Sequence, residues 1–124
     1  MRVVDTSAWI EWLMNTPTCD AVAAALPERA HWLVPTMVQL ELAKWVAREA
    51  SAEQADEVIA FSQKCVVIPL DTDIALAAAE LCRDHKLATA DAIVYATALA
   101  HDADLLTCDA HFESLPGVTV ISKA

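Results

Sequence analysis

Basic residues are scarce in this sequence. Only 8 Lys and Arg stand against 18 Asp and Glu among 124 residues, which gives a formal net charge of -10 at pH 7. Such a charge repels a polyanion at long range, and most nucleic-acid binders carry the opposite sign. The composition therefore argues against a broad basic binding surface. If several acids held a metal, however, the bound cation would reverse the sign locally.

Long apolar runs are also missing. The longest, residues 92–100 with Thr97 inside it, is far below the roughly 20 residues that span a bilayer. At the start of the chain, Arg2 and Asp5 enclose only two apolar residues, which excludes the pattern of a secretory signal. We therefore expect a soluble, cytoplasmic protein. The length fits a single domain over residues 1–124.

The cysteines form no metal or redox motif. No CxxC pair occurs, and no histidine lies at a zinc-finger interval from a cysteine, so buried, reduced thiols are expected. The scattered cysteines are Cys19, Cys65, Cys82 and Cys108. The histidines share no helical face or interval, so surface or capping roles are expected for them. They are His31, His85, His101 and His111.

Apolar residues are abundant for a short chain. They make up 56% of the sequence, and the mean hydropathy is +0.37. This excess suggests that some apolar surface is buried against another chain, so we expect an oligomer or a partner. Trp9 and Trp12 share one helical face, which favours a core or interface role over a platform for stacking RNA bases.

Strands and helices are predicted to alternate along the chain. Ser51 with Gln54, and Thr36 with Gln39, match the capping-box pattern that begins a helix. Strands are expected at residues 2–5, 31–34, 65–70, 105–109 and 118–121, and helices near 7–13, 18–26, 36–48, 51–64, 71–85 and 89–101. This order predicts an α/β fold with a central, mainly parallel sheet that is flanked by helices on both faces.

Two aspartates follow expected strands. Open parallel sheets bind ligands outside the carboxyl ends of their strands, and Asp5 and Asp109 lie at such ends. Each of them, taken alone, is equally typical of an aspartate that caps a turn or a helix. Their common position at the carboxyl edge nevertheless makes them candidate site residues.

Two further acids lie on predicted helices. Glu41 falls between Val38 and Trp45 of an apolar stripe, so it borders the core instead of facing water. Asp91 begins a largely apolar helix. Its favourable interaction with the helix N-terminus is worth only about 0.3 to 1 kcal/mol, which alone does not require an acid at this position. Four convergent carboxylates would repel one another until some were protonated, unless a cation neutralised them. Oxygen ligands favour Mg²⁺ or Mn²⁺ over zinc, and such sites commonly cut phosphodiesters.

Four segments carry a resemblance that covers the whole chain. They are Val4-Asp5-Thr6-Ser7, Val38-Gln39-Leu40-Glu41, Thr89-Ala90-Asp91-Ala92 and Leu105-Leu106-Thr107-Cys108-Asp109. In order and spacing they resemble the motifs of PIN-domain ribonucleases, most of all the VapC-like toxins of type II toxin-antitoxin pairs. The resemblance implies an Mg²⁺- or Mn²⁺-dependent endoribonuclease that is inhibited by a cognate antitoxin and forms a homodimer.

The resemblance also assigns roles to residues. It makes Asp5, Glu41, Asp91 and Asp109 the catalytic and metal-binding acids, and it places the hydroxyls of Thr6, Ser7 and Thr107 near metal, water or phosphate. Two positions depart from the family pattern. Ala110 replaces the basic or polar residue that often follows the last acid, and Lys86 replaces a common glycine. The first departure leaves substrate contact beside Asp109 open.

Other classes fit less well. A haloacid-dehalogenase phosphatase would need a second aspartate where Ser7 stands, and a receiver domain would need paired acids near the first strand. The remaining alternative is a catalytically inactive PIN-like module that binds a protein, although degenerate members usually lack one or more acids. Four cations could guide RNA or could simply be solvated. They are Lys44, Arg48, Arg83 and Lys86.

Overall fold

The structure, a computed structural model, describes residues 1–124 and has five parallel strands and six α-helices. The strands are β1 (Arg2–Val4), β2 (Trp32–Pro35), β3 (Val66–Ile68), β4 (Asp104–Thr107) and β5 (Val118–Val120). The α-helices are α1 (Thr6–Leu13), α2 (Cys19–Ala25), α3 (Thr36–Glu49), α4 (Ala52–Ser62), α5 (Thr72–His85) and α6 (Thr89–Ala100). Two short 3₁₀ helices are η1 (Arg29–His31) and η2 (Ala110–Phe112). The predicted α/β architecture with a central parallel sheet is confirmed.

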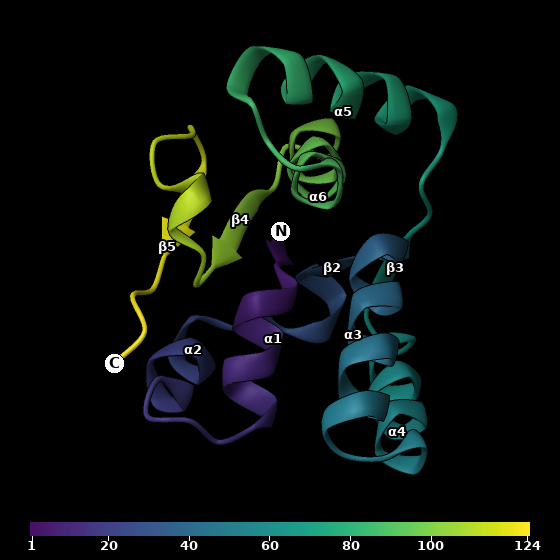
Figure 1. Cartoon of the computed structure of the whole chain (residues 1–124), viewed down its shortest axis with the longest axis vertical. Helices are drawn as coiled ribbons and strands as arrows, with labels where there is room; N and C mark the ends of the chain where they lie inside the picture. The colour runs from purple at the N-terminus through teal and green to yellow at the C-terminus, as the bar shows by residue number, and fades with distance from the viewer.

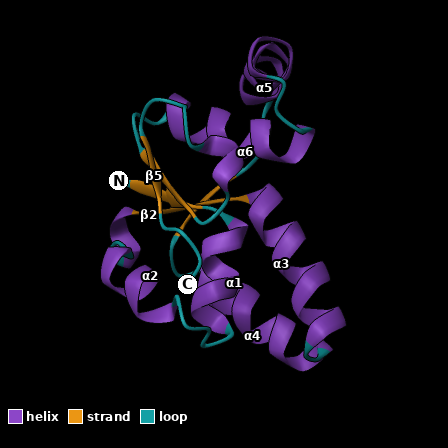
Figure 2. Cartoon of the chain, turned by 60° about the vertical axis from the view of Figure 1, so that its left-hand side comes forward, coloured by secondary structure: helices purple, strands orange, loops and turns teal.

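The strand order is β3-β2-β1-β4-β5, so the chain starts in the middle of the sheet. It runs outward through β2 to β3 and then returns past β1 to β4. Parallel crossovers are almost always right-handed, so these two directions place their helices on opposite faces. Figure 2 shows α5 and α6 on one face of the sheet and α1 to α4 on the other. The direction reverses between β1 and β4, where open α/β sheets commonly bind ligands.

The core lies on both faces of the central strands. Each of β1, β2 and β4 has a pair of apolar side chains with no exposed surface, because a parallel sheet that is covered on both sides leaves no solvated face. The helix α6 lies between the sheet and α5 (Figure 1), and residues 92–98 are all buried there. The longest apolar run is therefore a buried helix. None of the helices combines the length and apolar character needed to cross a membrane.

The two predicted capping boxes differ in outcome. Ser51 caps α4, since its side chain accepts a hydrogen bond from the Gln54 amide at 3.0 Å. The capping box of Thr36 and Gln39 is wrong. Pro35 is the capping position of α3, and Thr36 already lies inside the helix, where its Oγ1 accepts a hydrogen bond from Leu70 N at 3.2 Å. A tertiary contact thus uses the hydroxyl that the sequence pattern assigned to the helix end.

Most of the tryptophans belong to the core. Trp9 and Trp32 are buried and, with Trp12 and Phe61, form a cluster with ring centroids 4.7 to 6.0 Å apart. Both buried indole N–H groups lack a hydrogen-bond acceptor. They lie among aromatic rings, whose faces are weak acceptors. These rings are therefore not a platform for RNA bases. All four cysteines are free, and Cys108 is the one that is buried.

Candidate metal centre

The candidate centre lies at the carboxyl ends of β1 and β4. Asp5 follows β1 directly, and its backbone amide donates a hydrogen bond to the carbonyl of Leu106 at 2.8 Å, which extends the pairing of β1 with β4 by one residue. The carbonyl of Asp5 accepts hydrogen bonds from the amides of Ala8 and Trp9, which begin α1. The backbone of Asp5 is thus fixed by the sheet on one side and by a helix on the other.

The Asp5 carboxylate is held by two hydroxyls. Asp5 occupies the N-cap position of α1, as the capping interpretation expects, but its side chain makes no capping hydrogen bond to the later turns of that helix. Instead, Oδ2 accepts hydrogen bonds from Ser7 Oγ and Thr107 Oγ1, both at 2.8 Å. Asp5 is 5% exposed. Burial raises its pKa, hydrogen bonds from Thr107, Ser7 and the Thr6 backbone oppose that rise, and repulsion from Asp109 adds to it.

The same two hydroxyls also connect β1 to the segment after β4. Ser7 Oγ accepts a hydrogen bond from the amide of Cys108 at 3.0 Å, and Thr107 Oγ1 accepts one from the amide of Asp109 at 3.0 Å. The two oxygens lie 3.1 Å apart. Ser7 and Thr107 therefore set the position of Asp109 relative to Asp5.

Glu41 reaches the centre from α3. It is half-buried, as its place beside the apolar stripe predicts, and its Oε1 accepts a hydrogen bond from Thr6 Oγ1 at 2.7 Å. Burial raises the pKa of Glu41 and the charge of Asp5 raises it further, whereas the bond from Thr6 and the charge of Lys44 lower it. Since Thr6 follows Asp5 in the chain, the start of α1 holds two of the four acids in place.

Asp91 carries the clearest electrostatic signature. It is half-buried in the first turn of α6, and Ala88 occupies the capping position of that helix. The pKa of Asp91 is raised from 3.8 to about 6, first by burial and then by repulsion from Asp5, Asp109 and Glu41, while His111 opposes the rise. The other three predicted acids therefore all act electrostatically on Asp91. A helix N-terminus would lower the pKa of an aspartate, so the capping interpretation does not account for Asp91.

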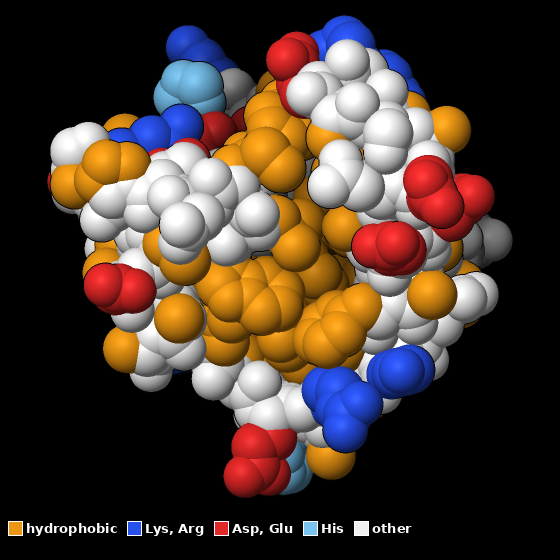
Figure 3. Space-filling view, turned by 90° about the horizontal axis from the view of Figure 1, so that it is seen from below, with side chains coloured by type: hydrophobic (Ala, Val, Ile, Leu, Met, Phe, Trp, Pro, Cys, Tyr) orange, Lys and Arg blue, Asp and Glu red, His pale blue; other side chains and the backbone are white.

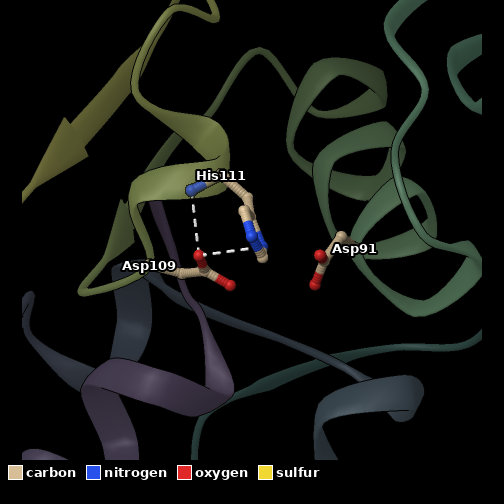
Figure 4. Close-up of side chains that lie close together, drawn as sticks. All are labelled: Asp91, Asp109 and His111. Atoms are coloured by element: carbon tan, nitrogen blue, oxygen red, sulfur yellow. Dashed lines mark hydrogen bonds and ion pairs between the residues drawn. The ribbon is translucent and has the colours of Figure 1, made fainter.

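Two atoms of His111 contact the Asp109 carboxylate. Its Oδ1 accepts a hydrogen bond from the backbone amide of His111 at 2.9 Å, and it lies 3.1 Å from His111 Nδ1. The capping interpretation is thus correct for one oxygen of Asp109. Figure 4 shows the imidazole beside Asp109, facing Asp91. One ligand atom from each of these three residues lies within 4.8 Å of the others.

The donors fit a divalent cation. Asp91 and Asp109 offer carboxylate oxygens at metal-sharing distance, as the sequence predicts for an Mg²⁺ or Mn²⁺ site. Asp5 and Glu41 belong to the same electrostatic cluster but lie outside this tight group. The sequence did not predict His111, which is 78% exposed at its side chain and has no ligand spacing beyond its position two residues after Asp109.

Three hollows surround the acids, and each is lined by a basic side chain. The first, of about 440 Å³, is lined by Asp109, Ala110 and Lys123 among others. The second, of about 190 Å³, is lined by Glu41, Lys44 and Arg48. The third, of about 270 Å³, is lined by Asp91, His111, His85 and Lys86. The predicted guide Arg83 lines none of them and instead pairs with Asp84 at 3.8 Å. The largest hollow, about 730 Å³ beside Phe61, contains none of the four acids.

Known structures share this fold over nearly the whole chain. A toxin-antitoxin complex from Klebsiella pneumoniae matches with a TM-score of 0.85 at 21% identity, covering all of both chains. Mycobacterium tuberculosis VapC20, described as a toxin that cleaves the sarcin-ricin loop, matches with a TM-score of 0.78 at 18% identity over 97% of this chain and 98% of the other. Rickettsia felis VapBC2, bound to a DNA fragment from its promoter, matches with a TM-score of 0.75 at 16% identity over 98% of this chain and 97% of the other.

The sequence comparisons give the family. No curated protein matches the sequence. The family model of the PIN domain, in contrast, matches residues 2–118. The match includes all four acids at the carboxyl edge of the sheet, and the solved structures with the same fold include toxins of toxin-antitoxin complexes. The chain therefore belongs to the PIN-domain family.

Proposed function

We propose that this protein is a divalent-metal-dependent endoribonuclease and the VapC-like toxin of a type II toxin-antitoxin pair. The observation that carries the proposal is the clustering of Asp5, Glu41, Asp91 and Asp109, in which burial and repulsion from the other three acids raise the pKa of Asp91 to about 6. A fold gains nothing from four repelling acids at one edge of its sheet unless they serve a ligand. The PIN-domain family and the toxins of the same fold support a nuclease.

In this proposal, the four acids bind Mg²⁺ or Mn²⁺. When bound, the cation would neutralise phosphate charge and lower the pKa of a water molecule. The residues of the chain set the geometry. Ser7 and Thr107 occupy Oδ2 of Asp5 and leave its other oxygen for the ion, while Thr6 does the same for Glu41. Burial and neighbouring charges, and no hydrogen bond, set the pKa of Asp91, so both of its oxygens can turn toward ion or water.

The basic side chains around the acids would contact RNA phosphates. Lys44, Arg48, Lys86 and Lys123 line hollows on three sides of the site, so a strand that enters any of them meets a positive charge. Lys123 shares its hollow with Ala110 and Asp109. This lysine from the C-terminal segment would therefore supply the charge that Ala110 lacks.

An apolar face of the molecule offers a binding surface for the proposed antitoxin. Figure 3 shows a hollowed apolar surface on the side of the molecule seen from below. Leu13, Met14, Val46 and Val58 line one cavity among the early helices. We propose that the antitoxin places an apolar helix on this side and a basic side chain in the acidic pocket, because a guanidinium can replace the cation. The relatives that were solved as toxin-antitoxin complexes support this arrangement.

Homodimerisation and location are parts of the same proposal. Leucines exposed on α5 and α6, such as Leu76 at 64% and Leu99 at 50%, provide apolar surface for a second copy of the chain. We place the protein in the cytoplasm, where both RNA and an antitoxin are made. Sedimentation of the purified protein at several concentrations would test the dimer.

The decisive experiment is RNA cleavage by the purified protein with Mg²⁺, with Mn²⁺ and with EDTA. Asp5→Asn and Asp109→Asn should each abolish most cleavage, whereas the exposed control substitutions Asp20→Asn and Glu113→Gln should not. Thermal unfolding verifies that each variant folds. Cleavage that is equally reduced in site and control variants would reject the site. Intact RNA under all metal conditions, together with antitoxin binding, would favour the inactive binding module.

A further inference from the structure

We infer that His111 supplies a nitrogen ligand to the divalent cation, so that the centre has mixed oxygen and nitrogen donors and favours Mn²⁺ over Mg²⁺. The inference rests on the proposed function, because it concerns the same site. It adds a ligand type that the four acids do not provide.

The turn after β4 fixes the imidazole beside the acids. Asp109 and His111 flank Ala110 in η2, and the hydrogen bond from His111 N to Asp109 Oδ1 at 2.9 Å holds the turn. The ring nitrogen Nδ1 lies 3.1 Å from the same oxygen. Asp91 approaches from α6, on the other side of the ring in the view of Figure 4. Two distant parts of the chain thus place three donor atoms within 4.8 Å of one another.

The contact of Nδ1 with Asp109 leaves the other ring nitrogen for a metal. If Nδ1 donates its proton to Asp109 Oδ1, the neutral ring keeps a lone pair on Nε2. Histidines that bind metals almost always donate their other ring N–H to a carboxylate or carbonyl in this way. Asp109 also keeps its second oxygen, since both contacts from His111 use Oδ1. An imidazole donor binds transition metals in preference to Mg²⁺.

A simple surface ion pair between His111 and Asp109 would not involve Asp91. The proximity of Asp91 to both residues therefore favours a metal site over a simple ion pair. His85 lines the same hollow as Asp91 and His111, so it is the second imidazole near the site and needs its own control. His31 lies in η1, outside all three hollows around the acids, and serves as a distant control.

Electron spin echo measurements on the full-length protein loaded with Mn²⁺ test the inference directly, because a coordinated imidazole modulates the echo through its nitrogen nucleus. We expect this modulation in the natural protein and in His31→Gln and His85→Gln, and we expect its loss in His111→Gln. Calorimetric titration should show Mn²⁺ bound about tenfold or more weakly by His111→Gln, with Mg²⁺ affinity changed less than about threefold. The substitution keeps the backbone amide that holds the turn.

The outcomes separate this inference from the proposed function. Absent modulation in Mn²⁺-loaded protein, modulation unchanged in His111→Gln, or modulation lost only in His85→Gln would each overturn the role of His111. RNA cleavage without nitrogen modulation would support the proposed nuclease and reject His111 as a metal ligand. Nitrogen modulation that disappears in His111→Gln, in a protein that cleaves no RNA, would support the ligand and reject the nuclease. Failure to bind Mn²⁺ at all would overturn both.

Discussion

Replacing Asp91 by asparagine should stabilise the metal-free protein above about pH 7. The pKa of Asp91 is raised from 3.8 to about 6, so the folded protein holds this proton more tightly than the unfolded chain does. Asp91 therefore contributes stability that is fully present below about pH 3.8 and is lost as the pH rises through about 6. The difference between the two pKa values corresponds to about 3 kcal/mol. Because the carboxyl is half-exposed, solvent screening reduces the expected effect to about 1 kcal/mol.

Urea unfolding in EDTA measures this difference. At about pH 8, Asp91→Asn should have the higher free energy of unfolding by about 1 kcal/mol, since it lacks a charge that burial and the neighbouring acids disfavour. At about pH 4 the advantage should largely vanish, because Asp91 is then protonated in the folded protein. The exposed control Asp56→Asn on α4 should show no such dependence on pH.

Metal should reverse the order of stability. A cation at about 100 times its dissociation constant stabilises a protein by about 2.7 kcal/mol if it binds only the folded state. The natural protein should show this gain with Mn²⁺, and Asp91→Asn should show less. If Asp91→Asn proved no more stable than the natural protein in EDTA at about pH 8, the reasoning from repulsion would be refuted. Equal stabilisation of both proteins by Mn²⁺ would remove Asp91 from the ligands.

Three further predictions follow from particular contacts. Thr107→Val removes a donor that lowers the pKa of Asp5, so the acidic limb of the pH profile of kcat/KM should move to higher pH. Lys86 has a φ of 55°, a conformation that glycine adopts without strain, so Lys86→Gly should raise the free energy of unfolding by about 1 kcal/mol. The same substitution removes a positive charge and should therefore weaken RNA binding and reduce its dependence on salt. Mg²⁺ should weaken antitoxin binding more than NaCl of matched ionic strength, and Asp91→Asn should reduce the difference; identical weakening would exclude competition for the acids.

The fold could be predicted because its determinants are local. Strands covered on both faces are runs of apolar residues, and acids or turn residues follow them. The ends of elements were less accurate. The strand expected at 65–70 forms only at Val66–Ile68, and Thr36 bonds to the loop after β3 instead of capping its helix. Both differences depend on contacts between segments that are far apart in the sequence.

The clustering of the acids could be predicted for the same reason, while their metal-binding and catalytic roles stay predictions. Position at a strand end or beside an apolar stripe identified Asp5, Asp109 and Glu41, and the structure places them around the point where β1 meets β4. His111 and Lys123 could not be found in this way. The contact of His111 with Asp109 depends on the 3₁₀ turn after β4, and Lys123 reaches the site from the segment after β5. Neither position has a periodicity that points to the site.

The hydroxyls show how structure refines a motif. The family resemblance places Ser7 and Thr107 near metal, water or phosphate. In the structure both donate to the same oxygen of Asp5, and both accept backbone amides from the segment that carries Asp109. Hydrogen bonds from these groups favour the charged form of a buried carboxylate. Ser7 and Thr107 therefore act through Asp5 and Asp109, by keeping Asp5 closer to its ionised form and fixing the distance between the two acids.

The proposed function requires a protein of net charge -10 to bind RNA, and the distribution of its charge is compatible with this. Half of its 8 basic residues line the three hollows around the acids, and they are Lys44, Arg48, Lys86 and Lys123. Without a cation, the acids at the centre of this ring oppose the attraction of the basic groups for phosphate. A bound divalent ion removes that opposition and adds positive charge at the same place. RNA affinity should therefore depend first on the metal and only then on the basic residues, whose contributions become measurable once the acids are neutralised.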